Sequence, residues 1–204
     1  MGEIRESKKR ETRQRISDVA TELFLARGFD AVTLDEIAVA AKVSKMTVFN
    51  YFARKEDLML DREDDLKLLP FREALRQRPK GQPPVDALRR LVDGLRDQKH
   101  PIARIDDQTV RWWRVVAASP SLMARLRELA DEAAEGLAIE IKGPKPDGLA
   151  RLMAGMIVLT VRTAREEAIR VFERGGSTKK ANAACLALID RGFAAVHEMA
   201  SSTK

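Results

Sequence analysis

The side chains best suited to contact a partner outside the fold are gathered in residues 45–52. This short stretch holds a lysine, a threonine, an asparagine and a tyrosine beside a methionine and two phenylalanines. Val48 and Phe52 are four residues apart, so on a helix they share an inward face and leave the others outside. Lysine and asparagine hydrogen-bond base edges, hydroxyls bind phosphates, and methionine or phenylalanine contacts thymine methyl groups. The stretch therefore has the chemistry of a helix that enters the major groove of DNA.

Two helix-start signals position this stretch. Thr33 followed by Glu36 is a capping box, which predicts a helix beginning at Leu34. Residues 42 and 43 then form a tight turn, and Ser44 caps a second helix over residues 45–52. Two short helices joined by so short a turn are typical of a helix-turn-helix motif.

The remaining pattern is helical throughout. The first helix is predicted to begin between Ser7 and Thr12 and to end at Gly28, and a fourth to run from residue 55 to 69 until Pro70 kinks or ends it. Residues 77–84 form a loop rich in proline and glycine. Further helices are predicted at about residues 85–100, 102–118, 120–141, 147–172 and 178–199, with Asp147 and Thr178 as caps. About nine helices and no strand predict an all-α fold.

Charge does not by itself show a nucleic-acid partner. The 204 residues carry a net charge of +6, but residues 1–60 hold eleven lysines and arginines against ten acidic residues. The local exception is the N-terminus, which is either a basic arm or helical turn that meets DNA or a solvated tail. Its cations are Arg5, Lys8, Lys9, Arg10, Arg13 and Arg15.

The sequence lacks the residues that several functional classes of protein require. One cysteine and two distant histidines provide neither a disulfide nor a metal cluster, and no motif for a cofactor or for enzymatic catalysis is found. The longest apolar run, residues 152–161, is about half of the ~20 residues that span a bilayer, and no signal segment is recognised. We expect a cytoplasmic, nucleoid-associated protein that has no cofactor, is not an enzyme and does not enter the membrane.

Residues 15–60 resemble the DNA-binding domain of the TetR family of bacterial repressors. The resemblance rests on Ala20, Leu23, Phe24, Gly28, Phe29, Thr33, Ile37, Ala38, Ala41, Val43, Ser44, Thr47, Tyr51, Phe52, Lys55 and Leu58. It implies a DNA-binding set in which Thr33, Thr47, Tyr51 and Lys55 hold phosphates and Lys45, Met46, Phe49 and Asn50 lie nearest the base edges, with Ser44 beside them. It further implies a three-helix DNA-binding domain over residues 1–54 and a helical ligand-binding and dimerisation domain over residues 55–204.

Two further sites follow from the resemblance and from the apolar pattern. The neighbouring Trp112 and Trp113 point about 100° apart on a helix, so one is either a core residue or part of a ligand cavity. The predicted pocket consists of Leu66, Leu69, Phe71, Arg111, Trp112, Val116, Met123, Met156 and Val161. The last two helices are apolar on more than one side, which predicts a homodimer through Leu152, Met153, Ile157, Ala184, Leu188 and Phe193.

The sequence therefore predicts a dimeric regulator of transcription, a repressor that a small-molecule effector releases from a pseudo-palindromic operator in double-stranded DNA. The fourth helix would couple the two domains. The alternative is a ligand-independent architectural or cell-cycle factor that binds DNA.

Overall fold

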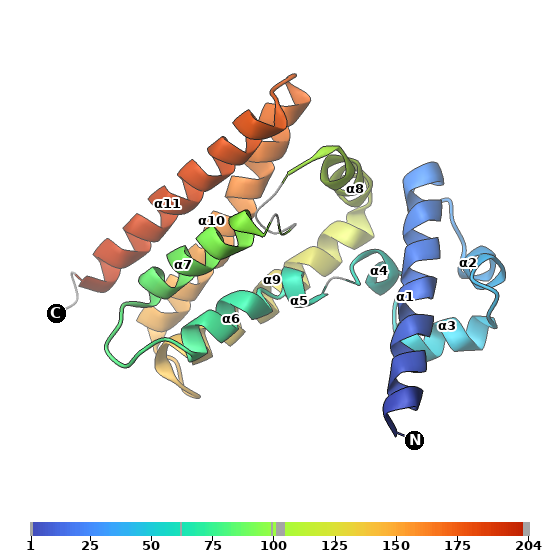
Figure 1. The fold of residues 1–204 in the computed structure, drawn as a ribbon, viewed down its shortest axis with the longest axis horizontal. Coiled ribbons are helices and arrows are strands. Elements are labelled where there is room, and N and C mark those ends of the chain that lie inside the picture. The colour runs from blue at the N-terminus through green and yellow to red at the C-terminus, as the bar shows by residue number, and fades with distance from the viewer. Residues whose placement is uncertain (1, 62, 99, 101–104, 202–204) are drawn as a thin grey trace. The chain divides into compact units, whose positions relative to one another are not determined.

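The computed structural model describes residues 2–61, 63–98, 100 and 105–201, and these form eleven α-helices without a β-strand (Figure 1). The all-α class is confirmed, with more helices than the nine predicted. The chain divides into two compact units, Met1–Glu63 with Arg111–Leu126, and Asp64–Val110 with Arg127–Lys204. The helices are α1 (Gly2–Arg27), α2 (Leu34–Ala40), α3 (Lys45–Tyr51), α4 (Lys55–Met59), α5 (Glu63–Leu66), α6 (Leu69–Arg76), α7 (Pro84–Asp97), α8 (Asp107–Ala118), α9 (Pro120–Lys142), α10 (Gly148–Glu173) and α11 (Thr178–Ser201).

The first unit is built around α1, against which α2 and α4 pack, and α3 packs on α2 (Figure 1). Ile16, Ala20 and Phe24 are fully buried on one stripe of α1, as helical spacing predicts. The helix ends where it was expected to, because Gly28 takes the left-handed conformation with φ 84. It begins at Gly2, before the predicted start, so the basic N-terminal segment is helical.

This unit extends beyond the boundary predicted at residue 54. The Ser17 hydroxyl donates to the Leu58 carbonyl over 3.3 Å, which ties α4 to α1. Arg125 on α9 forms an ion pair with Asp57 of α4, with Nε 3.1 Å from Oδ1. The Ser119 hydroxyl donates to Asp30 over 3.3 Å. The residues around the start of α9 therefore belong with the helix-turn-helix, which sequence spacing alone could not indicate.

The predicted fourth helix is not continuous. It is divided into α4, α5 and α6, and the break before α6 falls at Leu68, which has a left-handed φ of 52. A leucine in this conformation is disfavoured by roughly 1–2 kcal/mol, and burial of its side chain, 5% exposed in the core, offsets that cost. Pro70 lies in the first turn of α6, where a proline is tolerated, and so does not kink a longer helix.

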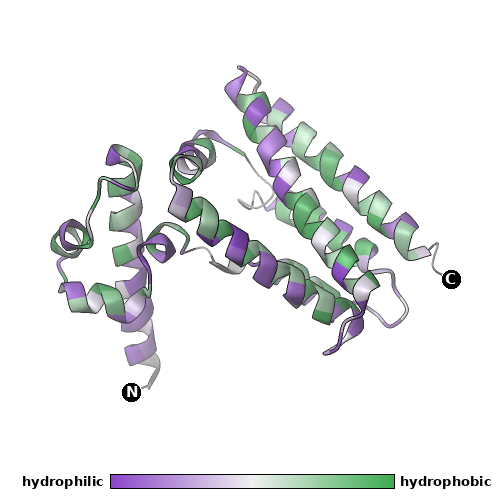
Figure 2. Cartoon of the chain, turned by 180° about the vertical axis from the view of Figure 1, so that it is seen from behind, coloured by the Kyte–Doolittle hydropathy of each residue, from purple (hydrophilic) through white to green (hydrophobic). Residues whose placement is uncertain are grey.

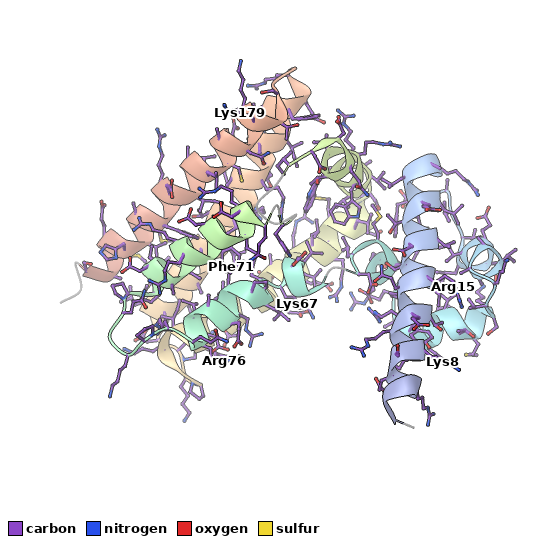
Figure 3. All side chains as sticks on the ribbon, viewed as in Figure 1. Lys8, Arg15, Lys67, Phe71, Arg76 and Lys179 are labelled. Atoms are coloured by element: carbon purple, nitrogen blue, oxygen red, sulfur yellow. The ribbon has the colours of Figure 1, made fainter. Side chains whose placement is uncertain are left out.

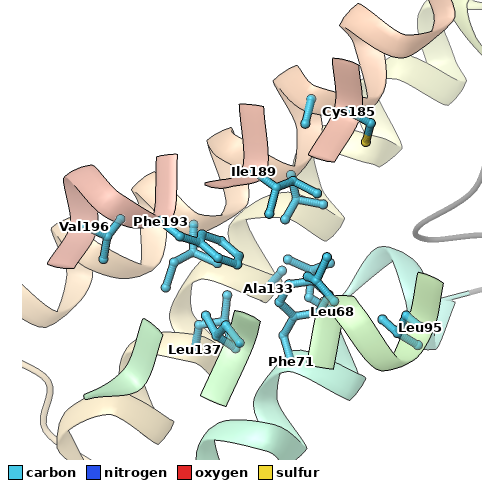
Figure 4. Packing of buried hydrophobic residues seen from close by; sticks show 14 of the residues in the cluster. Leu68, Phe71, Leu95, Ala133, Leu137, Cys185, Ile189, Phe193 and Val196 are labelled. Atoms are coloured by element: carbon cyan, nitrogen blue, oxygen red, sulfur yellow. The ribbon is translucent and has the colours of Figure 1, made fainter. Parts of the chain in front are cut away.

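The second unit has α10 and α11 as an antiparallel pair, with α7 packed on α11 and α6 on α7 (Figure 1). Phe71, Leu137 and Phe193 meet in its core, each fully buried (Figure 4). The two long helices approach closely at Gly192, where an added Cβ would lie 2.3 Å from the Thr160 side chain. A glycine is therefore required at that crossing.

The helix ends of the second unit follow the predicted signals with one change. Asp147 caps α10 by accepting from the Ala150 N–H over 2.8 Å, as predicted. The cap of α11 is Ser177, whose hydroxyl accepts from the Lys180 N–H over 3.3 Å, and Thr178 is the first helical residue. The predicted start of the α8 helix at Ile102 lies outside the described residues. Burial raises the pKa of the Cys185 thiol to about 11, consistent with a core residue.

One side chain ties the segment before α8 to α11. The Asn182 amide accepts from the Ile105 N–H over 2.7 Å and donates to the Ile105 carbonyl over 3.2 Å. It also donates to the Thr178 carbonyl over 2.9 Å. Ile105 is 1% exposed, so both of its backbone groups depend on this amide in place of water.

Replacing Asn182 with alanine is expected to lower the free energy of unfolding by about 1–3 kcal/mol, because two buried backbone groups lose their partner. Urea unfolding followed by circular dichroism measures the change. Asn182→Asp keeps only the acceptor and should give an intermediate loss. Equal stability of all three proteins would show that the amide does not hold this segment.

No helix among the described residues is both long and apolar enough to cross a membrane.

Candidate nucleic-acid interface

The first helix of the motif, α2, begins as the sequence predicts. The Thr33 hydroxyl accepts from the Glu36 N–H over 3.2 Å, and the Glu36 carboxylate accepts from the Thr33 N–H over 2.8 Å. The Thr33 backbone N–H, then Arg27 and the Thr33 hydroxyl, hold the pKa of Glu36 at about 2. Because the pKa is lowered from 4.5, the stabilisation is complete at neutral pH and is lost progressively as the pH falls from 4.5 to about 2.

The turn between α2 and α3 is a Schellman motif with an unusual residue. The Val43 N–H donates to the Ala38 carbonyl over 2.9 Å, and the Lys42 N–H donates to the Val39 carbonyl over 3.1 Å. Lys42 occupies the left-handed position with φ 55, where glycine is most common. Ser44 then caps α3 by accepting from the Thr47 N–H over 3.0 Å, as predicted. The turn is therefore fixed by backbone hydrogen bonds at both of its ends.

Lys42→Gly is expected to raise the free energy of unfolding by about 1 kcal/mol, because glycine adopts a positive φ without steric cost. Ala40→Gly, two residues earlier within the helix, should lower it by a similar amount. Thermal unfolding of both variants beside the unmodified protein checks this. A loss of stability in Lys42→Gly would mean that the turn does not strain Lys42.

The inward and outward faces of α3 are those predicted. Val48 and Phe52 are 1% and 3% exposed, whereas Met46 and Phe49 are 68% and 46% exposed. Lys45 and Asn50 are exposed as well. Large apolar side chains on a polar surface favour a contact surface over a merely solvated helix. The four residues predicted to lie nearest the base edges therefore all face outward from the motif.

The residues predicted to hold phosphates make contacts within the chain. The Thr47 and Ser44 hydroxyls are 2.8 Å apart, and the Thr33 hydroxyl donates to the Glu36 carboxylate over 2.8 Å. The Lys55 ammonium donates to the Phe29 carbonyl over 2.7 Å and lies 4.4 Å from the centre of the Phe29 ring. Lys55 therefore joins α4 to the segment after α1, a structural role that the sequence did not reveal.

Lys45 differs from Lys55 in how firmly it is held. Its ammonium lies 2.8 Å from the Asp35 carboxylate, with the two side chains 48% and 67% exposed. A pair so open to water contributes little and is easily exchanged for another acceptor. Tyr51 is half-buried at the end of α3. Lys45 is thus the cation of α3 that remains available for a base or a phosphate.

The structure gives two residues near this surface a position or a role that the sequence did not indicate. Val39 on α2 is 79% exposed. Its outward position depends on which face α2 turns toward the core, and the sequence alone did not indicate this. Arg13 donates to the Tyr51 carbonyl over 2.6 Å and lies 4.3 Å from the centre of the Phe52 ring, so α1 holds the end of α3. Arg13 is therefore a positioning residue, although the sequence grouped it with the free N-terminal cations.

The other N-terminal cations line the outside of α1. Arg5, Lys8, Lys9, Arg10 and Arg15 are all exposed. The first turns of the helix are hydrophilic, as the hydropathy colouring shows (Figure 2), and Lys8 and Arg15 lie along it (Figure 3). A helical basic strip in the same unit as α3 provides positive charge that the nearly neutral composition of residues 1–60 conceals.

The predicted ligand-pocket residues are divided between the units. Arg111, Trp112, Val116 and Met123 belong to the first unit, and Leu66, Leu69, Phe71, Met156 and Val161 to the second. Trp112 and Trp113 are both half-buried and meet edge to face, with ring centres 4.7 Å apart, so neither is the fully buried residue expected of the pair.

The predicted dimer residues also separate into two groups. Met153, Ile157 and Phe193 are at most 4% exposed within one chain and pack in its own core. Leu152 is 54% exposed, and Ala184 and Leu188 are half-buried. The outward face of α10 that carries Leu152 also carries Leu159, which is 51% exposed.

The fold and the α2–turn–α3 geometry define a helix-turn-helix protein, and comparison with known proteins shows which regulators it is similar to. Residues 16–61 match the model of the bacterial regulatory proteins of the tetR family. The chain is 31% identical over 134 residues to the HTH-type transcriptional regulator TcmR of Streptomyces glaucescens, covering 63% of this chain and 58% of TcmR. It is 44% identical over 50 residues to the HTH-type transcriptional regulator YdeS of Bacillus subtilis, covering 24% of this chain and 25% of YdeS.

The similarity in fold extends further than the similarity in sequence. The crystal structure of NalD, the secondary repressor of the MexAB-OprM multidrug efflux pump in Pseudomonas aeruginosa, matches 91% of this chain and 97% of its own with a TM-score of 0.56 at 20% identity. The chain thus spans a little over half of TcmR and a quarter of YdeS in sequence. The chain is therefore similar to regulators of the TetR family, and the match to the family model lies in residues 16–61. TcmR and YdeS are both named as transcriptional regulators, in agreement with the expectation that the chain is not an enzyme.

Proposed function

We propose that the protein is a homodimeric transcriptional regulator, a repressor that binds a pseudo-palindromic operator through α3 and that a small molecule releases. The observation that carries the proposal is the outer face of α3, where Met46 and Phe49 stand 68% and 46% exposed beside Lys45 and Asn50 on a helix capped at its start. In this proposal its site of action is the nucleoid, in the cytoplasm.

The residues divide into two roles in the proposed complex. Asn50 would pair with adenine, Lys45 would donate to guanine, and Met46 and Phe49 would contact thymine methyl groups. Thr33, Ser44, Thr47 and Tyr51 would position the motif on phosphates, with the exposed cations of α1 beside them. We retain Lys55 as a proposed phosphate contact, but its hydrogen bond to Phe29 gives it a structural role first.

Dimerisation is proposed through the outward face of α10 and α11. Leu152 and Leu159 are 54% and 51% exposed and lie seven residues apart on one side of α10. Gly155 lies between them, and an added Cβ there would meet no atom within 4 Å, so a second helix could approach closely. Ala184 and Leu188 of α11 extend the same proposal. Two copies of such a helix pair would form a four-helix interface.

A cavity of about 650 Å³ in the second unit favours a regulator that responds to a ligand over a DNA-binding factor that is independent of ligand. Its volume is in the range of small-molecule sites. Its lining contains none of the nine predicted pocket residues. Those nine residues remain a separate proposal for the effector site.

The interface is tested in a mobility-shift assay against an operator that is first selected from random double-stranded DNA. The variants are Lys45→Ala, Asn50→Ala and Tyr51→Phe. The first two should each weaken binding by about 1–3 kcal/mol and relax the preference at one base pair, because they remove a base contact. Tyr51→Phe should weaken all sequences alike by about 1 kcal/mol.

Lys179→Ala is the control, since Lys179 is an exposed cation on α11 (Figure 3). It should leave operator binding unchanged. Unaltered affinity and preference in all three α3 variants would overturn the assignment of α3 as the recognition helix.

A further inference from the structure

The cavity of the second unit lies where the loop between α6 and α7 meets the ends of α9 and α11. Its floor is apolar, with Leu75, Val85 and Met153 each at most 4% exposed. The 77–83 loop and the last turns of α11 form its walls. Gln82 of the loop and Ala200 of α11 are among the lining residues.

The wall of this cavity is held in place by Arg78. Its guanidinium donates to the Leu75 and Glu140 carbonyls over 2.7 and 2.9 Å and to the Ile141 carbonyl over 3.1 Å. These bonds fix the loop to the last turn of α9 and satisfy helix-end carbonyls there. The cavity is therefore formed before any ligand arrives, and Arg78 is occupied in forming it.

The carboxylate in the lining is neutralised within the protein. Glu140 accepts from Arg76 and pairs with Arg72 over 3.5 Å, and the hydrogen bond from Arg76 is the main cause of its lowered pKa (Figure 3 shows Arg76 at the end of α6). A ligand in the cavity would thus meet no unpaired negative side chain among the lining residues.

The polar side chains of the cavity lining that remain beside Arg76, Arg78 and Glu140 are mostly hydrogen-bond donors. The Lys80 ammonium and the His197 imidazole line the cavity, and neither makes a side-chain hydrogen bond or ion pair to the residues that the structure describes. Gln82 adds an amide on the same loop. An apolar floor with a cation and donors at its rim matches a molecule that has an apolar body and an anionic head.

We propose that this cavity binds an amphipathic carboxylate, with its apolar chain against Leu75, Val85 and Met153 and its carboxylate at Lys80 and His197. The inference rests on the ligand-responsive part of the proposed function, for which it names a site and a ligand class. Ligand binding in the cavity can be measured without DNA. A protein that does not bind the ligand can therefore be distinguished from a protein that does not bind the operator.

Isothermal titration of the full chain with decanoate, below its micelle concentration and without DNA, tests the proposal. We expect saturable binding with one site per chain. The double variant Lys80→Gln, His197→Gln should raise Kd about tenfold, because the carboxylate loses its charge-assisted partners. Decanol and decyltrimethylammonium should bind at least tenfold more weakly than decanoate.

Two blocking variants locate the site. Ala200→Trp fills the cavity from α11 and Gln82→Trp from the loop, and either should abolish binding. Ala124→Trp, at an exposed position of α9 outside the lining, is the control and should bind normally. Circular dichroism confirms that each variant is folded. Absence of saturable binding, binding that survives both blocking variants, or equal binding of decyltrimethylammonium would each overturn the proposal.

Discussion

Replacing Leu152 and Leu159 together with glutamate is expected to convert the protein from a dimer to a monomer and to weaken operator binding more than a hundredfold. Both side chains are about half exposed in the single chain, so their loss leaves its own core intact. In the proposed dimer they become buried, and four carboxylates would then face one another in an apolar interface. A monomer contacts one half-site only, so the affinity gained by linking two half-sites is lost.

Sedimentation equilibrium gives the mass of the double variant, and a mobility-shift assay gives its operator affinity. Ala124→Glu is the control, because it adds a carboxylate to an exposed position of α9 in the first unit. Circular dichroism shows whether the helices persist. A double variant that remains a dimer with unchanged operator affinity would place the dimer interface elsewhere.

The second large effect is expected at the ion pair that joins α9 to α4. The Arg125 and Asp57 side chains are 12% and 11% exposed, with Nε 3.1 Å from Oδ1. Arg125→Met would leave the Asp57 carboxylate buried beside a thioether. Removing one partner of a buried pair costs about 3 kcal/mol, so the free energy of unfolding should fall by about that amount.

An exposed pair provides the comparison. The Arg151 guanidinium lies 2.6 Å from the Glu135 carboxylate, and the two side chains are 55% and 48% exposed. Because water screens such a pair, Arg151→Met should cost less than about 1 kcal/mol. Urea unfolding of both variants measures the difference. Equal losses would mean that burial does not distinguish the two pairs.

The helix-turn-helix could be predicted in detail because its signals are local. The Thr33 capping box, the Ser44 cap and the Val48–Phe52 inward face each depend on residues within a few positions of one another, and the structure confirms all three. The same holds for the end of α1 at Gly28 and the Asp147 cap. Such features need no knowledge of the rest of the chain.

The errors arose where distant residues decide the local structure. The break before α6 depends on core burial of Leu68, which no neighbour in sequence indicates. Met153 and Leu152 are adjacent leucine-sized residues, and only the packing of α10 on α11 shows which one faces inward. The α6–α7 loop reads as a simple connection, yet it becomes one wall of the 650 Å³ cavity because α9 and α11 end beside it.

The division of the fourth helix also changes how the proposed coupling must work. A continuous helix from residue 55 to 69 was expected to transmit ligand binding to the DNA-binding motif. In the structure, the separate helices α4 and α5 take the place of that continuous helix. The Arg125–Asp57 ion pair holds α4 to α9. In the proposed coupling this buried pair connects α4 to α9. By linkage, operator DNA must weaken ligand binding by the same factor by which the ligand weakens operator binding.

Selection of bound DNA from a random double-stranded pool tests the central claim most directly. We predict that the unmodified protein enriches a pseudo-palindrome whose half-sites are about one helical turn apart, or a multiple of that spacing. Asn50→Ala should select the same spacing with the preference lost at one base pair in each half-site. A selected pool without a repeated half-site, or one that Asn50→Ala, Lys45→Ala and Met46→Ala all leave unchanged, would contradict recognition by α3.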